Sequence, residues 1–262
     1  MFPAGWNFIE TAGKEYIMNK IVALWVHPRS LSTVMERILI ERGDFKAFHE
    51  PFAYLYYVHD KKGSVPFMKV DPNHPTSFAD TKKMILDAAD ENPVCFKDMA
   101  YYVGDYIFED DEFLNRMTNV FMIRDVEKTV LSYYKVDPNV DRDEIGFEYL
   151  FKIFRKVADL NNNQPPPVIV AEDLENDPEG TVKALCEKID ITFMPESLSW
   201  EARPPEEMKD WDEWHKDLFS STGIQKDMEK FDMSVDDVPK LRSYYEYHLP
   251  FYEALLKHRT KP

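Results

Sequence analysis

The sequence predicts a single α/β domain in which helices flank a central parallel sheet of about five strands. Three observations support this fold class. Short apolar runs recur along the chain, stretches with helical spacing separate them, and no internal repeat or low-complexity tract breaks the order. The 262 residues, of which 44% are hydrophobic, suffice for one sizeable core and fit one domain better than two.

The expected strands are the clearest part of this pattern. Six apolar residues without alternation, Ile21–Val26, indicate a strand that is buried on both faces, as in a parallel sheet. A short strand is expected at Phe45–Phe48. Three later runs are bounded by polar residues or proline: Val94–Phe96, Asn119–Ile123 and Val168–Ala171.

Helical spacing follows or separates these runs. After Ser32, the apolar residues Val34, Met35, Ile38 and Leu39 share one helical face. Strands that alternate with helices imply a parallel sheet. The further helices are expected at Ser77–Asp90, Val126–Lys135, Glu144–Leu160, Thr181–Ile189 and Val238–His258, the last interrupted at Pro250.

Two segments fall outside this alternation. Residues 1–17 show no clear period, and we expect an N-terminal extension of undetermined role before a domain that spans residues 18–262. Residues 199–237 are rich in Pro, Trp, Asp and Glu, and we expect them to form a long ordered excursion over the functional site.

The net charge and the cysteine content exclude several classes of protein and of partner. With 32 Lys and Arg against 48 Asp and Glu, the net charge is −16, so neither a nucleic acid nor an anionic membrane is expected as a partner. Cys95 and Cys186 give no disulfide framework and no metal-ligand cluster. No apolar run has the length of a membrane span, and we expect a cytoplasmic protein that requires no metal. Composition carries no information on the oligomeric state.

A basic, hydroxyl-rich turn, Pro28-Arg29-Ser30-Leu31-Ser32-Thr33, connects the first strand to a helix. The first amides of a helix have no intrahelical partner and lie at the positive end of its dipole. With Arg29 and the three hydroxyls, they form a candidate site for a phosphate or sulfate group. The alternative is that Ser30 or Ser32 caps the helix and Arg29 is a solvated charge. Neither G-x-x-x-x-G-K-[ST] nor G-x-G-x-x-G is present.

Notable polar residues lie at the ends of the five expected strands. In chain order they are Arg29, Glu50, Lys97, Arg124 and Glu172. Ligands of open parallel sheets bind beyond the carboxyl ends of the strands. We therefore expect these residues to surround one site.

A second motif begins where the fourth strand ends. Arg124 closes that strand, and Ser132 lies two turns into the helix that follows. An arginine can clamp a phosphate with two hydrogen bonds, and a hydroxyl eight residues on can reach the same group if the turn is tight. By themselves, these residues also fit a local Arg124–Asp125 ion pair and a neutral helix serine.

Together the two segments resemble the sulfotransferase family, whose members bind 3′-phosphoadenosine 5′-phosphosulfate on a P-loop-like α/β fold. The turn Pro28–Thr33 resembles the loop that holds the 5′-phosphosulfate, in the Pro-Arg-Ser-x-Ser-Thr form of bacterial and carbohydrate members. Ile123-Arg124-Asp125 with Ser132-Tyr133-Tyr134 resembles the family's 3′-phosphate motif. A third match consists of Val170–Leu174, Asp177-Pro178 and Leu185-Cys186.

The resemblance runs from about Ile21 to Phe193, with two departures. Leu31 replaces the glycine that is common in the loop, which removes easy access to a positive φ. Val126 replaces the usual proline after Arg-Asp, a change of helix start that leaves the chemistry intact.

The resemblance implies an activity and a set of binding residues. Arg29 and the amides of Ser30, Leu31, Ser32 and Thr33 would hold the 5′-phosphosulfate of the donor. Arg124 and Ser132 would hold its 3′-phosphate. The implied reaction is in-line transfer of a sulfuryl group to a hydroxyl or amine of a small-molecule acceptor, with a general base and no metal.

The segment Phe48-His49-Glu50-Pro51-Phe52 supplies two candidates for that general base, since a strand end followed by proline would fix both titratable side chains near the first loop. Glutamate followed by proline resembles the carbohydrate-type enzymes, in which a carboxylate takes the proton, and favours Glu50 over His49. Lys97 would neutralise the leaving group or the sulfuryl oxygens, or it would pair with Asp98.

Aromatic residues are candidates for the wall of an acceptor pocket, although such clusters are often plain core. They are Tyr54, Tyr56, Tyr57, Tyr101, Tyr102, Trp211 and Trp214. The stretch Ser220–Lys226 lies where family members place a loop over the nucleotide.

Two other functions remain open at this stage. A nucleotide-dependent phosphotransferase could share the P-loop-like layout, although the Walker lysine loop is missing. A protein with this fold could also bind the nucleotide without sulfonating an acceptor, or use a sulfonated intermediate for elimination or cyclisation.

Overall fold

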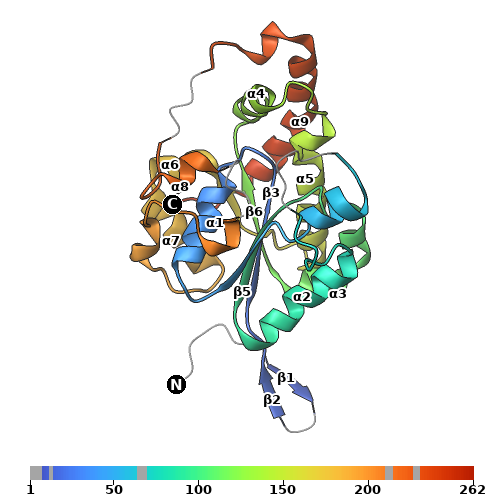
Figure 1. Cartoon of the computed structure of the whole chain (residues 1–262), viewed down its shortest axis with the longest axis vertical. Coiled ribbons are helices and arrows are strands. Elements are labelled where there is room, and N and C mark those ends of the chain that lie inside the picture. Colours follow the sequence, from blue (N-terminus) through green and yellow to red (C-terminus); the bar gives the residue numbers. More distant parts are fainter. Residues whose placement is uncertain (1–7, 12–13, 64–69, 210–214, 227–230) are drawn as a thin grey trace.

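The computed structural model describes residues 8–11, 14–63, 70–209, 215–226 and 231–262 (Figure 1). Its strands are β1 (Phe8–Thr11), β2 (Lys14–Ile17), β3 (Ile21–Val26), β4 (Lys46–His49), β5 (Val94–Met99), β6 (Thr118–Ile123) and β7 (Val168–Val170). Strands β1 and β2 form a separate antiparallel pair within the segment expected as an extension. The others form one five-stranded parallel sheet in the order β4-β5-β3-β6-β7, so the predicted single α/β domain with a parallel sheet is confirmed.

Helices lie on both sides of this sheet. Their bounds are α1 (Ser32–Glu41), α2 (Phe78–Glu91), α3 (Asp111–Arg116), α4 (Val126–Val136), α5 (Phe147–Leu160), α6 (Ala171–Asn176), α7 (Pro178–Lys188), α8 (Lys216–Phe219) and α9 (Pro239–Leu256). Figure 1 shows α1, α6 and α7 on one side of the sheet and α2, α3 and α5 on the other.

Burial on both faces explains why β3 is apolar throughout. Ile21, Ala23 and Trp25 pack into a core shared with α2, α3, α4, α5 and α9. The alternate residues Val22, Leu24 and Val26 pack into a second core with α1, α6 and α7. Successive side chains of a strand point to opposite faces of the sheet. Because β3 has a core on each face, both sets of side chains must be apolar, and polar and apolar residues do not alternate.

The strand order places the crevice of the sheet beside β3. From β3 the chain crosses through α1 to β4 on one side, and it later passes from β5 to β6 on the other. Connections that diverge in this way leave space beyond the carboxyl ends of the strands. The residues that follow β3, β4, β5 and β6 therefore meet at one edge.

Lys97 does not follow its strand, and that prediction is wrong. It lies within β5, opposite Leu24 of β3 and His49 of β4. Its ammonium group contacts the carboxylate of Glu50 inside the protein. An apolar run ends at the first charged residue, but a strand continues when that charge has a buried partner.

Helix α9 is continuous, so the expected interruption at Pro250 is also wrong. Proline has no N–H and frees the carbonyl of the residue four positions earlier, which is Glu246. Both Glu246 and Pro250 are exposed, so water can bind the freed carbonyl.

Helix α5 begins later than expected because of Gly146. This glycine has a φ of 87° and separates a 3₁₀ turn at Asp143–Ile145 from α5. A Cβ atom at Gly146 would lie 3.2 Å from the Cβ of His27 and 3.3 Å from the Cδ of Pro28. Glycine therefore allows the start of α5 to approach the loop after β3 closely.

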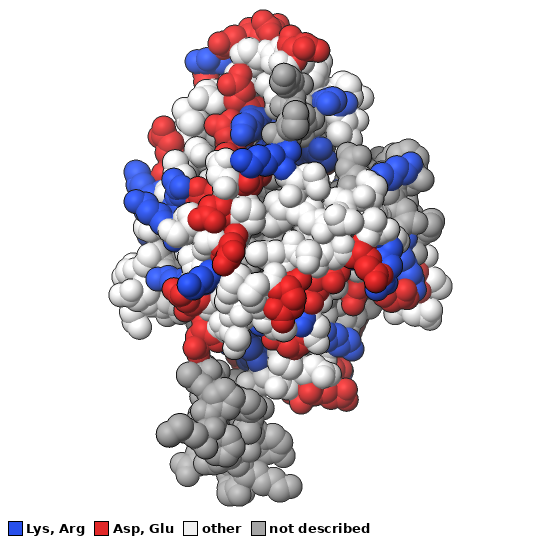
Figure 2. Space-filling view, turned by 90° about the vertical axis from the view of Figure 1, so that its left-hand side faces the viewer, with Lys and Arg blue, Asp and Glu red and all other residues white. Residues whose placement is uncertain are grey.

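Acidic and basic side chains alternate over the face drawn in Figure 2, around an uncharged centre. The described residues of this face form no continuous basic surface of the kind that a nucleic-acid backbone binds. Within the described ranges, no helix combines the length and the apolar character needed to cross a membrane.

Replacing Pro250 by alanine should stabilise the protein. Alanine restores the hydrogen bond to the Glu246 carbonyl, and we expect the free energy of unfolding in urea to rise by about 2 kcal/mol. Ser243→Ala, on the same exposed helix, is the control and should change it by less than about 0.5 kcal/mol. An unchanged or lower value for Pro250→Ala would contradict a continuous α9.

Candidate active site

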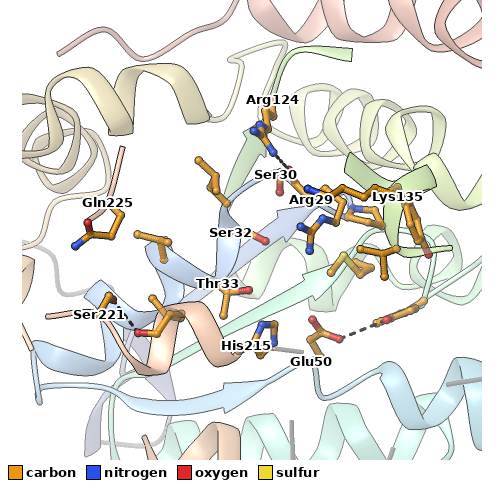
Figure 3. Close-up of a pocket in the computed structure, with 18 of the residues that line it drawn as sticks. Arg29, Ser30, Ser32, Thr33, Glu50, Arg124, Lys135, His215, Ser221 and Gln225 are labelled. Atoms are coloured by element: carbon orange, nitrogen blue, oxygen red, sulfur yellow. Dashed lines mark hydrogen bonds between the residues drawn. The ribbon is translucent and has the colours of Figure 1, made fainter. Parts of the chain in front are cut away.

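A cavity of about 550 Å³ opens at the carboxyl edge of the sheet (Figure 3). The loop after β3 and the first turn of α1 form one wall, and Glu50 and Arg124 follow β4 and β6. Tyrosines and the segment from His215 to Lys226 complete it. The lining residues are Pro28, Arg29, Ser30, Leu31, Ser32, Thr33, Val34, Glu50, Tyr57, Met99, Tyr101, Tyr102, Arg124, Tyr133, Lys135, Val136, His215, Leu218, Ser221, Gly223, Gln225 and Lys226.

The loop after β3 contains two residues in the left-handed region. Arg29 and Leu31 both have a φ of 61°. Leu31 thus adopts the conformation that a glycine would take without strain. The substitution leaves the turn possible, at a cost of about 1–2 kcal/mol in backbone strain.

Helix α1 presents its positive end to the cavity. It begins at Ser32, and its first turn contains no acidic residue. In Figure 3 the side chains of Ser32 and Thr33 extend into a space that Arg29, Glu50 and His215 surround. Unpaired amides, a guanidinium and two hydroxyls in this arrangement suit a tetrahedral anion.

His27 joins the loop to the second motif. The backbone N–H of Arg124 donates to its Nε2 at 3.1 Å, so Nδ1 carries the proton and donates to the Pro28 carbonyl at 2.9 Å. Burial lowers the pKa of His27 to about 3, which keeps the ring neutral. The ring stacks on Phe147 at 3.9 Å, and the hydroxyl of Ser30 donates to the His27 carbonyl.

Side-chain contacts also connect the two arginine motifs. The Nε of Arg29 donates to the Oγ of Ser132 at 2.9 Å. The Nη1 of Arg124 donates to the backbone carbonyl of Arg29 at 3.0 Å. The structure therefore brings together Arg29, Arg124 and Ser132, as expected from the sequence, although Ser132 is buried behind Arg29.

Of the two expected base candidates, Glu50 lines the cavity. One of its carboxylate oxygens contacts the Nζ of Lys97, and the other accepts a hydrogen bond of 3.4 Å from the hydroxyl of Tyr102. The Tyr102 hydroxyl lies 3.2 Å from that of Tyr57. Lys97 itself is completely buried and does not line the cavity.

His49 lies behind Glu50, away from the cavity wall. Its Nδ1 lies 3.0 and 2.9 Å from the two carboxyl oxygens of Glu36, a buried residue of α1. Its Nε2 is 3.9 Å from an oxygen of Glu50. The ring packs edge-on against His215, which does line the cavity.

The backbone around Glu50 is fixed from β5. Glu50 has a φ of 43°, which is strained for a residue with a side chain. Its N–H donates to the Lys97 carbonyl at 2.9 Å. The N–H of Phe52 donates to the Oδ2 of Asp98 at 2.8 Å. Consecutive residues of one strand thus hold both ends of the Glu50-Pro51 turn.

The buried groups below the cavity have displaced pKa values. Burial raises the pKa of Glu36 to about 8 and raises that of Asp98 well above its usual range. Burial, together with the charge of Lys97, lowers the pKa of His49 to about 3. Burial also acts to lower the pKa of Lys97, but Glu50 and Glu36 outweigh it, so the net shift is upward.

Tyrosines form the wall beside Glu50. The cavity contains Tyr57, Tyr101 and Tyr102, as expected, and Tyr133 in addition. Tyr101 and Tyr102 meet edge-on at 4.9 Å. Tyr54 and Tyr56, by contrast, do not line the cavity, and Tyr54 stacks on His74 at 3.9 Å. Trp211 and Trp214 lie outside the described residues.

Several residues that line or support the cavity were not predicted from the sequence. Lys135 follows Ser132 by three positions, which places both on one face of α4, and this spacing could have identified it. His27 and Glu36 carried no such signal, because their partners Arg124 and His49 lie 97 and 13 residues away. The segment Ser220–Lys226, chosen only by position, does contribute to the wall.

No group of His, Cys, Asp and Glu suited to a metal ion occurs among the described residues. A cavity with a cationic cradle and one carboxylate can bind an anionic group and accept a proton from a second molecule beside it.

A model of the sulfotransferase domain family matches residues 19–260. Two relatives from Arabidopsis thaliana also match, the branched-chain-amino-acid aminotransferase-like proteins 2 and 1, with 26% identity over 261 residues and 27% over 256. These alignments cover 92% and 91% of this chain but 43% and 42% of the relatives. The chain therefore spans less than half the length of the curated relatives it matches.

Solved structures agree with the family match. The sulfotransferase domain from the Synechococcus PCC 7002 olefin synthase has a TM-score of 0.54 at 14% identity, covering 94% of this chain and 98% of that domain. A sulfotransferase from Alicyclobacillus acidocaldarius has a TM-score of 0.53 at 13% identity, covering 92% of this chain and 96% of that protein. At such low identity these structures show a shared fold. Because the family model matches nearly the whole chain, the chain belongs to the sulfotransferase domain family.

Proposed function

We propose that this chain transfers a sulfuryl group from 3′-phosphoadenosine 5′-phosphosulfate to a hydroxyl or amine of a small-molecule acceptor. One observation carries the proposal. The same cavity holds a cationic cradle at the start of α1 and, across the open space, the carboxylate of Glu50. Sulfuryl transfer needs these two features, an anion clamp and a base, on either side of the reacting sulfur.

The cradle suits the donor at two points. Arg29 and the first amides of α1 would hold the 5′-phosphosulfate, and Lys135 lines the same cavity. Arg124 and Ser132 would hold the 3′-phosphate. Arg29 and Arg124 both line the cavity, and Ser132 reaches this pair through the hydrogen bond from Arg29, which supports a neighbouring position for the two proposed anion sites.

Glu50 is proposed as the base. It would take the proton of the acceptor hydroxyl as the acceptor oxygen bonds to sulfur and the bond from sulfur to the departing phosphate oxygen breaks. The products are the sulfated acceptor, adenosine 3′,5′-bisphosphate and a proton. Positioning and electrostatic stabilisation supply most of the catalysis in the related phosphoryl transfers. His49 lies behind Glu50, which supports the carboxylate over the imidazole.

The acceptor would bind against Tyr57, Tyr102 and the neighbouring tyrosines. Aromatic rings provide apolar contact area, and their hydroxyls orient a polar group. A cavity of about 550 Å³ matches a small molecule, in keeping with the proposed acceptor class.

Loss of the 3′-phosphate clamp should remove the preference for the 3′-phosphorylated nucleotide. We expect Arg124→Ala and Ser132→Ala to weaken binding of adenosine 3′,5′-bisphosphate by about 10- to 100-fold, because the charge-assisted bonds to the 3′-phosphate are lost. Binding of adenosine 5′-monophosphate should weaken less, since it loses only the support that Arg124 and Ser132 give to Arg29. Calorimetry measures both nucleotides. Lys128→Ala, at a half-exposed lysine of α4 whose ammonium group pairs with Glu172, is the control. Undiminished preference for the bisphosphate in both variants would show that the assignment is wrong.

Loss of the base should abolish turnover without loss of donor binding. The purified chain is incubated with donor and a metabolite extract, and mass spectrometry detects any species that gains a sulfonate group. Glu50→Gln should reduce the rate of that product by about 100-fold or more while bisphosphate binding stays unchanged. His49→Ala should retain more activity than Glu50→Gln. If the wild type consumes no donor with any acceptor, the proposed activity itself is refuted.

A further inference from the structure

Three carboxyl groups and one ammonium group are buried together below the cavity. Glu36, Glu50 and Asp98 are at most 5% exposed, and Lys97 is 0% exposed. A charge removed from water requires a partner at close range. One lysine can neutralise one carboxylate, so the geometry decides which of the three is ionised.

The contacts of Lys97 favour Glu50 as the ionised carboxyl group. Its Nζ contacts Glu50 Oε1 directly, whereas the nearest oxygen of Glu36 is 3.6 Å away. Glu50 is also the member of the three that lines the cavity and meets solvent. A carboxylate at this position has both its counter-charge and access to a reacting molecule.

The contacts of Glu36 suit a neutral carboxyl group. Its oxygens flank the Nδ1 of His49, and a protonated carboxyl donates to a neutral imidazole nitrogen. Burial raises the pKa of Glu36 to about 8 and lowers that of His49 to about 3, so both groups are uncharged near pH 7.

The contacts of Asp98 also suit a neutral carboxyl group. Its Oδ2 accepts from the Phe52 N–H, and its Oδ1 has no hydrogen-bond partner among the described residues. A buried carboxylate would leave that oxygen charged and unsolvated, whereas a protonated carboxyl does not. Burial raises the pKa of Asp98 accordingly.

We propose that Lys97 is a positioning residue that keeps Glu50 ionised, and that Glu36 and Asp98 are held as neutral carboxyl groups so that the single buried positive charge is left to Glu50. The functional meaning rests on the proposed role of Glu50 as the base, but the charge assignment does not. The titratable and charged groups that face this cluster are Cys95, His49, Tyr57, Tyr102 and His215.

Nuclear magnetic resonance of the protein labelled with ¹³C at the glutamate carboxyl carbons tests the assignment without any substrate. Glu36→Gln and Glu50→Gln identify the two resonances. At pH 6 the wild type should show Glu50 at the carboxylate position and Glu36 at the carboxylic-acid position. In Lys97→Met, the Glu50 resonance should move toward the carboxylic-acid position, because its counter-charge is gone.

Two further variants keep this test decisive. Lys97→Arg retains the charge and should leave Glu50 ionised. Lys46→Met removes an exposed lysine of the adjacent strand and should change neither resonance. If Lys97→Met does not fold, the wild-type spectrum alone shows whether Glu50 is ionised and Glu36 is neutral. Two carboxylate resonances at pH 6, or a neutral Glu50, would overturn the proposal.

The dependence of stability on pH gives a second measurement. The folded state holds the Glu36 proton more tightly than the unfolded chain, whose group titrates at 4.5. This stabilising contribution is complete below pH 4.5 and is lost as the pH rises to about 8. Relative to Glu36→Gln, the wild-type folding constant in urea should therefore fall about tenfold per pH unit in the middle of this range and level off above pH 8. A constant ratio would show that Glu36 is ionised throughout.

Failure of the charge assignment and failure of the proposed activity are distinguishable. A chain that never consumes donor can still show the expected two resonances. If donor is consumed, Lys97→Met should lower kcat at neutral pH with a partial recovery at alkaline pH, while bisphosphate binding stays unchanged. Loss of kcat with no dependence on pH would assign Lys97 a purely structural role.

Discussion

The burial of a lysine ammonium in the middle of a parallel sheet is the constraint on which the site depends. Lys97 occupies β5 between β3 and β4, where no water is available to solvate its charge. A partner must therefore come from the neighbouring elements. The chain after β4 turns sharply so that Glu50 reaches this ammonium, and the same turn directs the second Glu50 oxygen to the cavity side.

Three residues with side chains adopt a strained backbone conformation at this same edge of the sheet. Arg29, Leu31 and Glu50 all have positive φ values without being glycine. Each is held by several contacts, including the bond from Arg124 to the Arg29 carbonyl and the bond from Glu50 to the Lys97 carbonyl. Strained residues persist where the surroundings determine their conformation, and such positions gather at functional sites. Both sides of the cavity are thus held by contacts within the protein.

The family match includes the whole candidate site but only part of the length of the relatives. The family match covers residues 19–260 and includes all the residues that line the cavity, whereas the Arabidopsis relatives are more than twice as long as the matched part. The site is therefore contained in the shared domain. The fold by itself does not identify an acceptor.

The sequence by itself determined the parallel sheet, the two arginine motifs and the family. Apolar runs and helical spacing are local properties, and Arg29, Arg124 and Ser132 stand in short motifs whose order along the chain is informative. The tertiary structure alone decided that Lys97 lies inside β5, that His27 connects the two motifs, and that Glu36 shares a buried cluster with Glu50. The physical reason is that desolvation and ion pairing depend on distances between side chains from different strands and helices, which no local pattern encodes.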